Sequence, residues 1–322
     1  MSAGAGWRMS GGATRGDGRA AVPVAIAGAT GYIGGLLARE LAGRGHRVIA
    51  LARRPDSGAA AALREAGCEI VRADVLDRPS LEAGLAGAAV AYYLVHSMGR
   101  GSEGDFAARD RRGAANFTAA AAAAGVRRIV YLGGLGQGSE HLDSRHETAR
   151  VLAAGEVPLT YFRAAAVIGA GSESFRTVLH LVRRLPAMVT PRWVGTRTQP
   201  IAIADVVSYL AAAADLAAPL EREIQIGGPD VTTYGGMMDA MARAMGRRPP
   251  VRISVPVLSP RLSSLWVGLV TPVDPGIARP LIEGLSTETV VTDPSGMSLF
   301  DVEPTPLEEA MRAALEEGAR DV

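Results

Sequence analysis

Three glycines near the start of the chain have the spacing of a phosphate-binding turn. They follow the apolar run 23–27, which predicts a buried strand, and apolar residues then recur at helical spacing. Such a turn gathers backbone N–H groups at the positive end of a helix dipole, which suits a pyrophosphate. Gly28 would allow the tight turn, Gly31 the approach of the phosphate, and Gly34 the packing of helix on strand. The residues of this turn that we expect to contact a dinucleotide are Gly28, Thr30, Gly31, Tyr32, Ile33 and Gly34.

The end of the next predicted strand, 46–51, indicates which dinucleotide binds. Arg53 and Arg54 follow this strand, and Arg53 stands 19 positions after Gly34, near the ~20 at which a carboxylate commonly holds the ribose 2′-hydroxyl of NAD. Guanidinium groups pair with a phosphate instead, so we expect NADP(H), with NADPH preferred to NADH. Two alternatives stay open: the glycines form an ordinary strand–helix turn, and the arginines are a solvated strand end.

Length and composition limit the class of protein. A chain of 322 residues with 48% apolar residues and a formal net charge of +1 indicates neither disorder nor a nucleic-acid-binding surface. Its single cysteine, Cys68, excludes an internal disulfide and a multi-cysteine site, and we predict no metal. All 34 basic residues are arginine, which excludes Schiff-base chemistry. Residues 1–21 have no apolar core and no stretch is long enough for a membrane span, so we expect a disordered tail and a cytoplasmic protein.

Strand-like runs alternate with helical patterns up to about residue 165. This alternation predicts an α/β fold, a doubly wound parallel sheet of the Rossmann type with helices on both faces. We expect a dinucleotide-binding core over 22–165 and a small C-terminal substrate-side subdomain over 166–322, interleaved with the core. The predicted strands are 23–27, 46–51, 69–72, 90–95, 128–132, 159–163 and 223–226, and the predicted helices beyond the glycine turn are 58–66, 79–86, 105–124, 143–154, 204–214, 233–246 and 304–317.

Several longer motifs carry a family resemblance. They are Gly28–Gly34, Tyr92–Gly99 (Tyr-Tyr-Leu-Val-His-Ser-Met-Gly), Arg163 with Ile168–Ser172, Pro191–Val194 and Thr198–Ala202. In these motifs the chain resembles the atypical short-chain dehydrogenases/reductases, in particular their NmrA-like, bacterial NAD(P)H-binding branch. The resemblance covers roughly 22–315. It implies a Rossmann fold that binds NAD(P)H, with oxidoreductase activity in many members and a non-catalytic role in some.

The resemblance also assigns cofactor contacts outside the glycine turn. The matched residues are Asp74, Val75, Leu94, Val95, His96 and Gly133. The first two match a pair that touches adenine, the next three match a loop beneath adenosine and ribose, and Gly133 is expected near the nicotinamide. Two alternatives stay open: Asp74 is a turn or N-cap residue, and His96 is a loop histidine bonded to backbone.

The usual catalytic residues of that family are missing. Standard members have a serine after the fifth strand and a Tyr-x-x-x-Lys pair on the next helix, whose tyrosine donates a proton. Here Gly133 and Gly134 occupy the serine region, and lysine is absent. His141 and Arg145 match the tyrosine and lysine positions, and helical structure there would bring them to one face. They are the candidate catalytic residues, His141 as proton donor and Arg145 holding ribose or phosphate; the alternative is a solvated helix start.

Two functions remain open. The first is an NADP(H)-dependent oxidoreductase that transfers a hydride to an electron-poor, quinone-like or conjugated small molecule, which needs positioning more than a protein acid. The second is a non-catalytic NADP(H)-binding sensor, regulator or assembly factor. The stretch 257–290 is expected to form a substrate lid or the face of a homo-oligomer. The residues expected to line the substrate site are Phe175, Leu179, Trp193 and Trp266.

Overall fold

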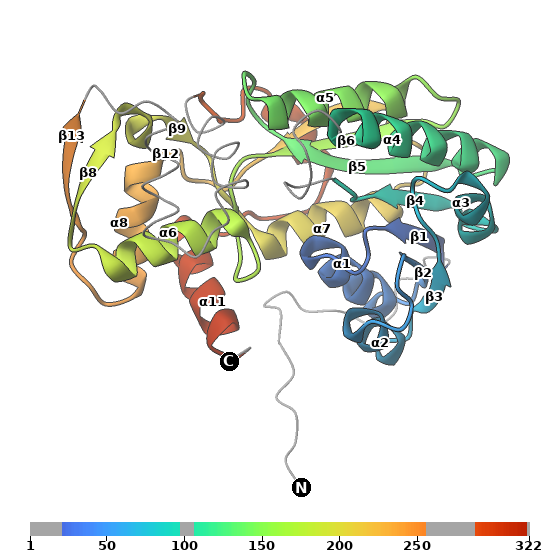
Figure 1. Cartoon of the computed structure of the whole chain (residues 1–322), viewed down its shortest axis with the longest axis horizontal. Helices are drawn as coiled ribbons and strands as arrows, with labels where there is room; N and C mark the ends of the chain where they lie inside the picture. The colour runs from blue at the N-terminus through green and yellow to red at the C-terminus, as the bar shows by residue number, and fades with distance from the viewer. Residues whose placement is uncertain (1–20, 97–105, 256–286, 321–322) are drawn as a thin grey trace, which may run out of the picture.

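A parallel sheet of seven strands runs through the larger part of the molecule, and its order is β11-β6-β5-β4-β1-β2-β3 (Figure 1). The computed structural model describes residues 21–96, 106–255 and 287–320. Because β2 and β4 lie on opposite sides of β1, the winding reverses between β1 and β4, and this reversal leaves a crevice at the carboxyl ends of the strands. The strands of the sheet are β1 (Pro23–Ala27), β2 (Arg47–Ala52), β3 (Glu69–Arg72), β4 (Val90–Tyr93), β5 (Arg128–Gly134), β6 (Leu159–Ala164) and β11 (Arg222–Ile226).

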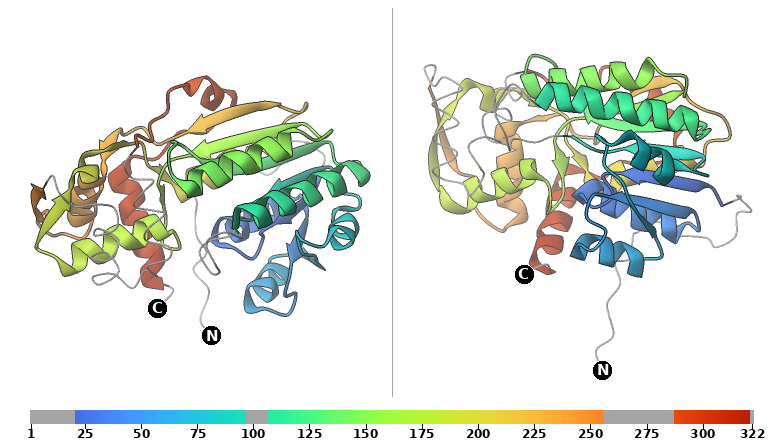
Figure 2. Two further views of the ribbon diagram at one scale, coloured as in Figure 1. Left: turned by 45° about the horizontal axis from the view of Figure 1, so that its top comes forward. Right: turned by 45° about the vertical axis from the view of Figure 1, so that its right-hand side comes forward.

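Helices cover both faces of this sheet (Figures 1 and 2). One face packs against α1, α2 and α7, and the other against α3, α4 and α5. Within the described ranges, no helix is both long and apolar enough to cross a membrane. The bounds of these helices are α1 (Tyr32–Gly43), α2 (Gly58–Glu65), α3 (Arg78–Leu85), α4 (Phe106–Ala123), α5 (Glu140–Ala153) and α7 (Ile203–Ala214).

Successive residues of each central strand enter different cores, because side chains alternate between the two faces of a strand. In β1, Val24 and Ile26 pack toward α1 and α7, whereas Ala25 packs toward α3 and α4. All three are completely buried. Burial on both faces explains why this strand reads as a continuous apolar run instead of an alternating one.

The structure confirms the predicted doubly wound parallel sheet and every strand predicted for it, with ends that differ by at most two residues. Helix α5 begins at Glu140 and not at 143, because the Ser139 side chain caps it by accepting a hydrogen bond from the backbone N–H of Leu142. Cys68 is buried in the core, as expected for a small apolar residue, and burial raises the pKa of its thiol.

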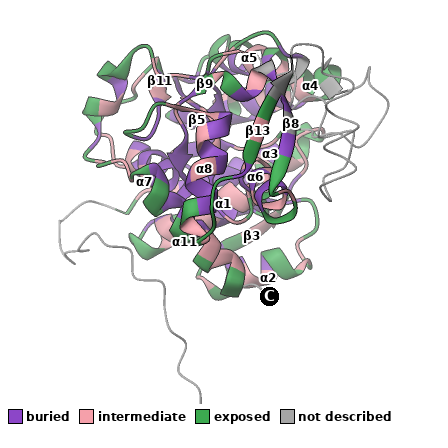
Figure 3. Ribbon diagram, turned by 90° about the vertical axis from the view of Figure 1, so that its left-hand side faces the viewer, coloured by how far each residue is buried: buried purple, intermediate pink, exposed green. Residues whose placement is uncertain are grey.

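The second half of the chain also forms a smaller lobe with its own core, at the left of Figure 1. The sequence analysis did not predict α6, although Phe175, Val178 and Val182 repeat at helical spacing along its buried side. The lobe ends in the paired strands β8 and β13, and Val251 and Ile253 lie on the exposed side of β13 (Figure 3). Its elements and the connecting strands are β7 (Val167–Ile168), α6 (Glu173–Arg184), β8 (Ala187–Pro191), η1 (Arg192–Gly195), β9 (Arg197–Thr198), β10 (Ile201–Ala202), β12 (Thr232–Thr233), α8 (Tyr234–Ala244), β13 (Val251–Val255) and α11 (Leu307–Arg320). The short helix η2 (Pro294–Leu299) packs instead on β11 of the large sheet.

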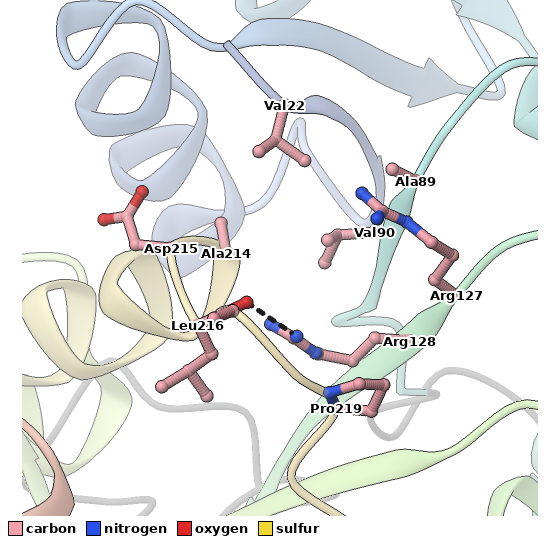
Figure 4. Close-up of a pocket in the computed structure, with 10 residues that line it drawn as sticks. Val22, Ala89, Val90, Arg127, Arg128, Ala214, Asp215, Leu216 and Pro219 are labelled. Carbon is pink, nitrogen blue, oxygen red and sulfur yellow. Dashed lines mark hydrogen bonds between the residues drawn. The ribbon is translucent and has the colours of Figure 1, made fainter. Parts of the chain in front are cut away.

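One buried arginine joins β5 to the end of α7 at the amino edge of the sheet (Figure 4). The side chain of Arg128 is 5% exposed, and its guanidinium donates hydrogen bonds to the carbonyl oxygens of Ala213 and, at 3.0 Å, Leu216. A positive group at the carboxyl end of a helix also interacts favourably with the helix dipole. Beside it lies an open cavity of about 280 Å³, which Arg127 and Asp215 also line.

We predict that Arg128→Met destabilises the protein by about 2–4 kcal/mol, because hydrogen bonds from a charged group are worth about 1.5–3 kcal/mol each and the carbonyls lose their partner. Urea unfolding followed by circular dichroism measures the change. The neighbouring Arg127 is exposed and makes no side-chain hydrogen bond in the described part of the chain, so Arg127→Met should change the free energy of unfolding by less than about 0.5 kcal/mol. Equal effects of the two substitutions would contradict the role given to Arg128.

Candidate dinucleotide site and active site

The turn after β1 passes very close to the end of β4. Gly28 has φ +91°, and an added Cβ atom would lie 2.6 Å from the carbonyl oxygen of Leu94. The backbone N–H of Leu94 in turn donates to the carbonyl of Ala27 at 2.9 Å. Only glycine fits both the conformation and the space at position 28.

The other two glycines have different surroundings. At Gly34 an added Cβ would overlap the carbonyl oxygen of Gly28, so this glycine brings α1 against the turn. At Gly31, which precedes α1, the backbone is extended, and an added Cβ would meet only the Gly28 oxygen, at 3.2 Å. No side chain caps the start of α1, and its first turn has no acidic side chain. The first N–H groups of this helix therefore have no side-chain acceptor of α1 itself, as binding of a pyrophosphate requires.

The arginines after β2 are available to a ligand. Arg53 and Arg54 are exposed, and neither side chain forms a hydrogen bond or ion pair with the residues that the structure describes. They lie between the end of β2 and the Ser57 cap of α2, at the same sheet edge as the glycine turn. This position fits a phosphate on the adenosine ribose.

In the loop after β3, Asp74 has the turn role that remained open as an alternative from the sequence. The Asp74 side chain accepts a hydrogen bond from the backbone N–H of Leu76 at 2.9 Å, which makes it a turn residue. Its side chain is half-buried, so adenine contact and turn formation are compatible. The carbonyl of Val75 accepts a hydrogen bond from Asn116 of α4 at 3.0 Å, which fixes the loop against that helix.

Beyond β4, Leu94 and Val95 are half-buried and His96 is exposed. Strand β4 ends at Tyr93, two residues before the predicted end, because the chain turns at Leu94 to contact the glycine turn. The three residues therefore lie at the crevice between β1 and β4, where a dinucleotide crosses the sheet.

The side chain of Tyr32 links the glycine turn to the smaller lobe. Its hydroxyl lies 3.1 Å from both carboxylate oxygens of Glu317 in α11, and the same carboxylate accepts a hydrogen bond from the N–H of Ala170. A Cβ atom at Gly169 or Gly171 would overlap the Tyr32 side chain, which explains the glycines of that motif. No local pattern indicates that Glu317 contacts Tyr32, since the two residues are 285 positions apart.

Side chains of α5 cover one side of the end of β5. Leu142 and the aliphatic part of Arg145 lie over Gly134, and the Arg145 Nε atom is buried without a hydrogen-bond partner. An unpaired buried donor beside the strand end suits an acceptor atom of a bound ligand. His141 and Arg145 both lie in helix α5, so the backbone there is helical, as the prediction that they share one helix face requires. The side chain of His141 lies outside the described part of the structure.

Comparison with known proteins identifies the larger part of this site. Residues 28–169, which include the glycine turn and all strands from β2 to β6, match the model of a family described as NAD(P)H-binding. This part of the chain is an NAD(P)H-binding domain. The match confirms the NAD(P)H-binding core that the glycine turn and the other motifs indicate.

Individual relatives support the same fold. Cinnamoyl-CoA reductase 1 of Oryza sativa subsp. japonica is 35% identical over 118 residues, which are 35% of this chain and about a third (34%) of that protein. The NADPH-dependent quinone oxidoreductase QOR2 of Escherichia coli, solved with NADPH, aligns with a TM-score of 0.71 and 20% identity over 89% of this chain and 98% of that one. The triphenylmethane reductase of Citrobacter sp., solved with NADP(H), aligns with a TM-score of 0.72 and 19% identity over 91% and 99%. At these identities the structural likeness shows the fold alone.

The expected apolar lining of a substrate site is wrong for one residue. Phe175 is 1% exposed and packs inside the core of the smaller lobe, because α6 turns it toward α8 and α11. Leu179 and Trp193 are half-buried at the margin of that core. Trp266 lies outside the described residues, as do residues 1–20 of the expected tail and 257–286 of the stretch 257–290.

Tyr161, His146 and Arg163 form a group beside β5 that was not predicted from the sequence. The hydroxyl of Tyr161 lies 3.4 Å from Nδ1 of His146, and Nε2 of His146 lies 3.3 Å from Nη2 of Arg163. Arg163 is held by the carbonyls of Gly134 and Gly136 and by an ion pair with Glu223 at 2.7 Å. Tyr161 and Arg163 both belong to β6, and the packing of α5 against this strand brings His146 to them.

Gly31→Val tests the glycine turn. We expect a folded protein, because the extended backbone at Gly31 accepts a branched residue, and loss of NADPH binding, because the side chain would fill the space beside the helix N-terminus. Fluorescence titration with NADPH measures the affinity. Gly43→Val, in open space at the other end of α1, is the control and should retain binding. Full NADPH affinity in a folded Gly31→Val protein would mean that the turn is structural only.

Proposed function

We propose that this protein is an NADPH-dependent oxidoreductase that reduces an electron-poor, quinone-like or conjugated small molecule. The observation that carries the proposal is the glycine turn, which leaves the start of α1 without a side-chain cap at the sheet edge where Arg53 and Arg54 lie. These two arginines have no side-chain partner among the described residues. Two solved proteins of the same fold support it by their names, a quinone oxidoreductase and a triphenylmethane reductase.

The residues present fit an NADP(H) molecule along the whole sheet edge. The N–H groups beside Gly31 would hold the pyrophosphate, and Arg53 and Arg54 would hold the 2′-phosphate. Arg145 would donate to the second ribose or its phosphate near the end of β5. When bound, the reduced nicotinamide supplies a hydride.

The chemical class of the acceptor is inferred from the catalytic side chains that are missing at the end of β5. Gly133 and Gly134 bring no hydroxyl of their own to that edge, and the chain has no lysine to lower the pKa of a tyrosine. A conjugated acceptor spreads the charge of the reduced product over its own bonds, so it needs positioning more than a proton from a protein acid. A simple ketone lacks this advantage.

A panel of acceptors tests the function. The purified protein is mixed with NADPH and with quinones, enones and unconjugated ketones, and the absorbance of the reduced nicotinamide is followed. We expect turnover with at least one conjugated acceptor and none with the ketones. If NADPH binds and no acceptor is reduced, the oxidoreductase proposal fails and the sensor or assembly function takes its place.

We predict that NADPH binds roughly tenfold to a hundredfold more tightly than NADH, because a charge-assisted pair contributes about 1.5–3 kcal/mol. In the double variant Arg53→Ala/Arg54→Ala this preference should disappear. Isothermal titration with both cofactors measures it, and the affinity for NADH is the internal control, since NADH has no 2′-phosphate. Equal affinities in the unmodified protein, or an unchanged preference in the variant, would refute the assignment.

We predict different effects for the two candidate residues of α5. Arg145→Ala should weaken NADPH binding by about tenfold, as expected for loss of one charged hydrogen bond, whereas Arg127→Ala, on the opposite sheet edge, should not. His141→Ala should lower kcat by less than about fivefold, because the acceptor stabilises its own product charge. Steady-state kinetics measure both, and a hundredfold loss of kcat in His141→Ala would instead identify a general acid.

A further inference from the structure

The hydroxyl of Tyr161 lies where a side chain at Gly133 would begin. An added Cβ atom at Gly133 would be 2.7 Å from the Tyr161 oxygen. The strand register explains this: Tyr161 pairs with Tyr131 in β5, and Gly133 is two residues farther toward the carboxyl edge. The Tyr161 ring stacks on Tyr131, with centroids 5.3 Å apart and planes at 19°, and its hydroxyl reaches that edge.

This hydroxyl differs from those of two other tyrosines of the sheet, Tyr92 and Tyr131. Tyr92 donates to the carbonyl of Leu210 at 2.6 Å, and Tyr131 donates to the carbonyl of Arg145 at 3.3 Å. The hydroxyl of Tyr161 has no carbonyl partner among the described residues, and its hydrogen-bond contact is the long one to His146. Burial raises the pKa of Tyr161, so the hydroxyl keeps its proton and stays a donor.

His146 can direct the proton of this hydroxyl in two ways. If Nε2 of His146 carries the ring proton, it donates to the carbonyl of Gly136 at 3.0 Å, and Nδ1 accepts the proton of Tyr161. If Nδ1 carries it, Nε2 accepts from Arg163, and Nδ1 donates to the Tyr161 oxygen. In the second arrangement the Tyr161 proton is free for a different acceptor.

A groove reaches this group of residues from solvent. It has a volume of about 600 Å³ and runs between α5 and β11, on the sheet face that α5 leaves uncovered. Gln137 and Gly138, in the loop after β5, place one end of the groove near the carboxyl edge of the sheet. Tyr161, His146 and Arg163 all line it.

We propose that the Tyr161 hydroxyl, positioned by His146, donates a hydrogen bond to the oxygen of the acceptor molecule and takes the place of the serine hydroxyl missing at Gly133. The proposal rests on the proposed function, because it needs an oxygen-bearing acceptor at the end of β5. The nicotinamide half of a bound dinucleotide would lie over the β4–β6 half of such a sheet, to which Tyr161 belongs. The donor gains most when negative charge develops on that oxygen during reduction.

Tyr161→Phe removes the hydroxyl and keeps the stacked ring. With the best acceptor of the panel we expect kcat to fall by about a hundredfold, as for loss of one hydrogen-bond donor in an active site, with an unchanged affinity for NADPH. The control is Tyr209→Phe, a buried tyrosine on the opposite face of the sheet, which should change kcat by less than about twofold. Circular dichroism and urea unfolding check that both variants fold.

A binding measurement decides the proposal even if no acceptor is reduced. With saturating NADP⁺, 4-nitrophenolate is titrated into the protein, because its oxygen carries the partial charge of a reduced product and its absorbance reports hydrogen bonding. We expect binding by the unmodified protein and by Tyr209→Phe, and at least about tenfold weaker binding by Tyr161→Phe. No binding of 4-nitrophenolate to the unmodified protein, or equal affinity in a folded Tyr161→Phe variant, would overturn the proposal. Failure of the acceptor panel alone would overturn only the proposed function.

Discussion

The close approach of the turn after β1 to the end of β4 is the constraint on which the site depends. Gly28 has a left-handed backbone conformation there, and no Cβ atom fits between it and the carbonyl of Leu94. The same turn packs against α1 through Gly34, so strand, turn and helix meet without side chains between them. As a result the first N–H groups of α1 point into the crevice at the carboxyl edge, and everything else in the site is arranged around that fixed point.

Arginine supplies every basic side chain of this protein, and its planar guanidinium serves structural roles as well as ligand binding. Arg128 holds the carboxyl end of α7, and Arg163 bridges the carbonyls of Gly134 and Gly136. Arg252 binds both carboxylate oxygens of Asp239, at 2.6 and 2.7 Å. By contrast, the exposed side chains of Arg53 and Arg54 have no hydrogen-bond or ion-pair partner among the residues that the structure describes. The Nε atom of Arg145 is buried without a partner, as is the Nε atom of Arg128, whose other nitrogens are bonded. That contrast is the electrostatic argument for a phosphate-bearing ligand.

The smaller lobe is held to the sheet by the carboxylates of Asp205, which is buried, and Glu317, which is half-buried, as well as by apolar packing. Asp205 of α7 accepts hydrogen bonds from the backbone N–H and the hydroxyl of Thr305, just before α11. Burial raises the pKa of Asp205, whereas the two hydrogen bonds from Thr305 lower it, and burial has the larger effect. Glu317, near the end of α11, then binds the Tyr32 hydroxyl beside the glycine turn. The glycine turn is therefore in direct contact with the smaller lobe through Tyr32.

The sequence by itself determined the fold class, the order of the sheet's strands and helices along the chain, and the glycine turn. These features depend on local patterns: apolar runs, helical spacing, and glycines between strand and helix. It also placed Arg53 and Arg54 beside the turn, since a strand end lies at a known distance along the chain from the glycines. The tertiary structure decided what long-range pairing brings together. The pairing of β5 with β6 puts the Tyr161 hydroxyl at Gly133, and the folding of α11 onto the turn puts Glu317 at Tyr32. It also buried Phe175, which the sequence assigned to a substrate site, because an apolar aromatic reads the same whether it faces a ligand or a core.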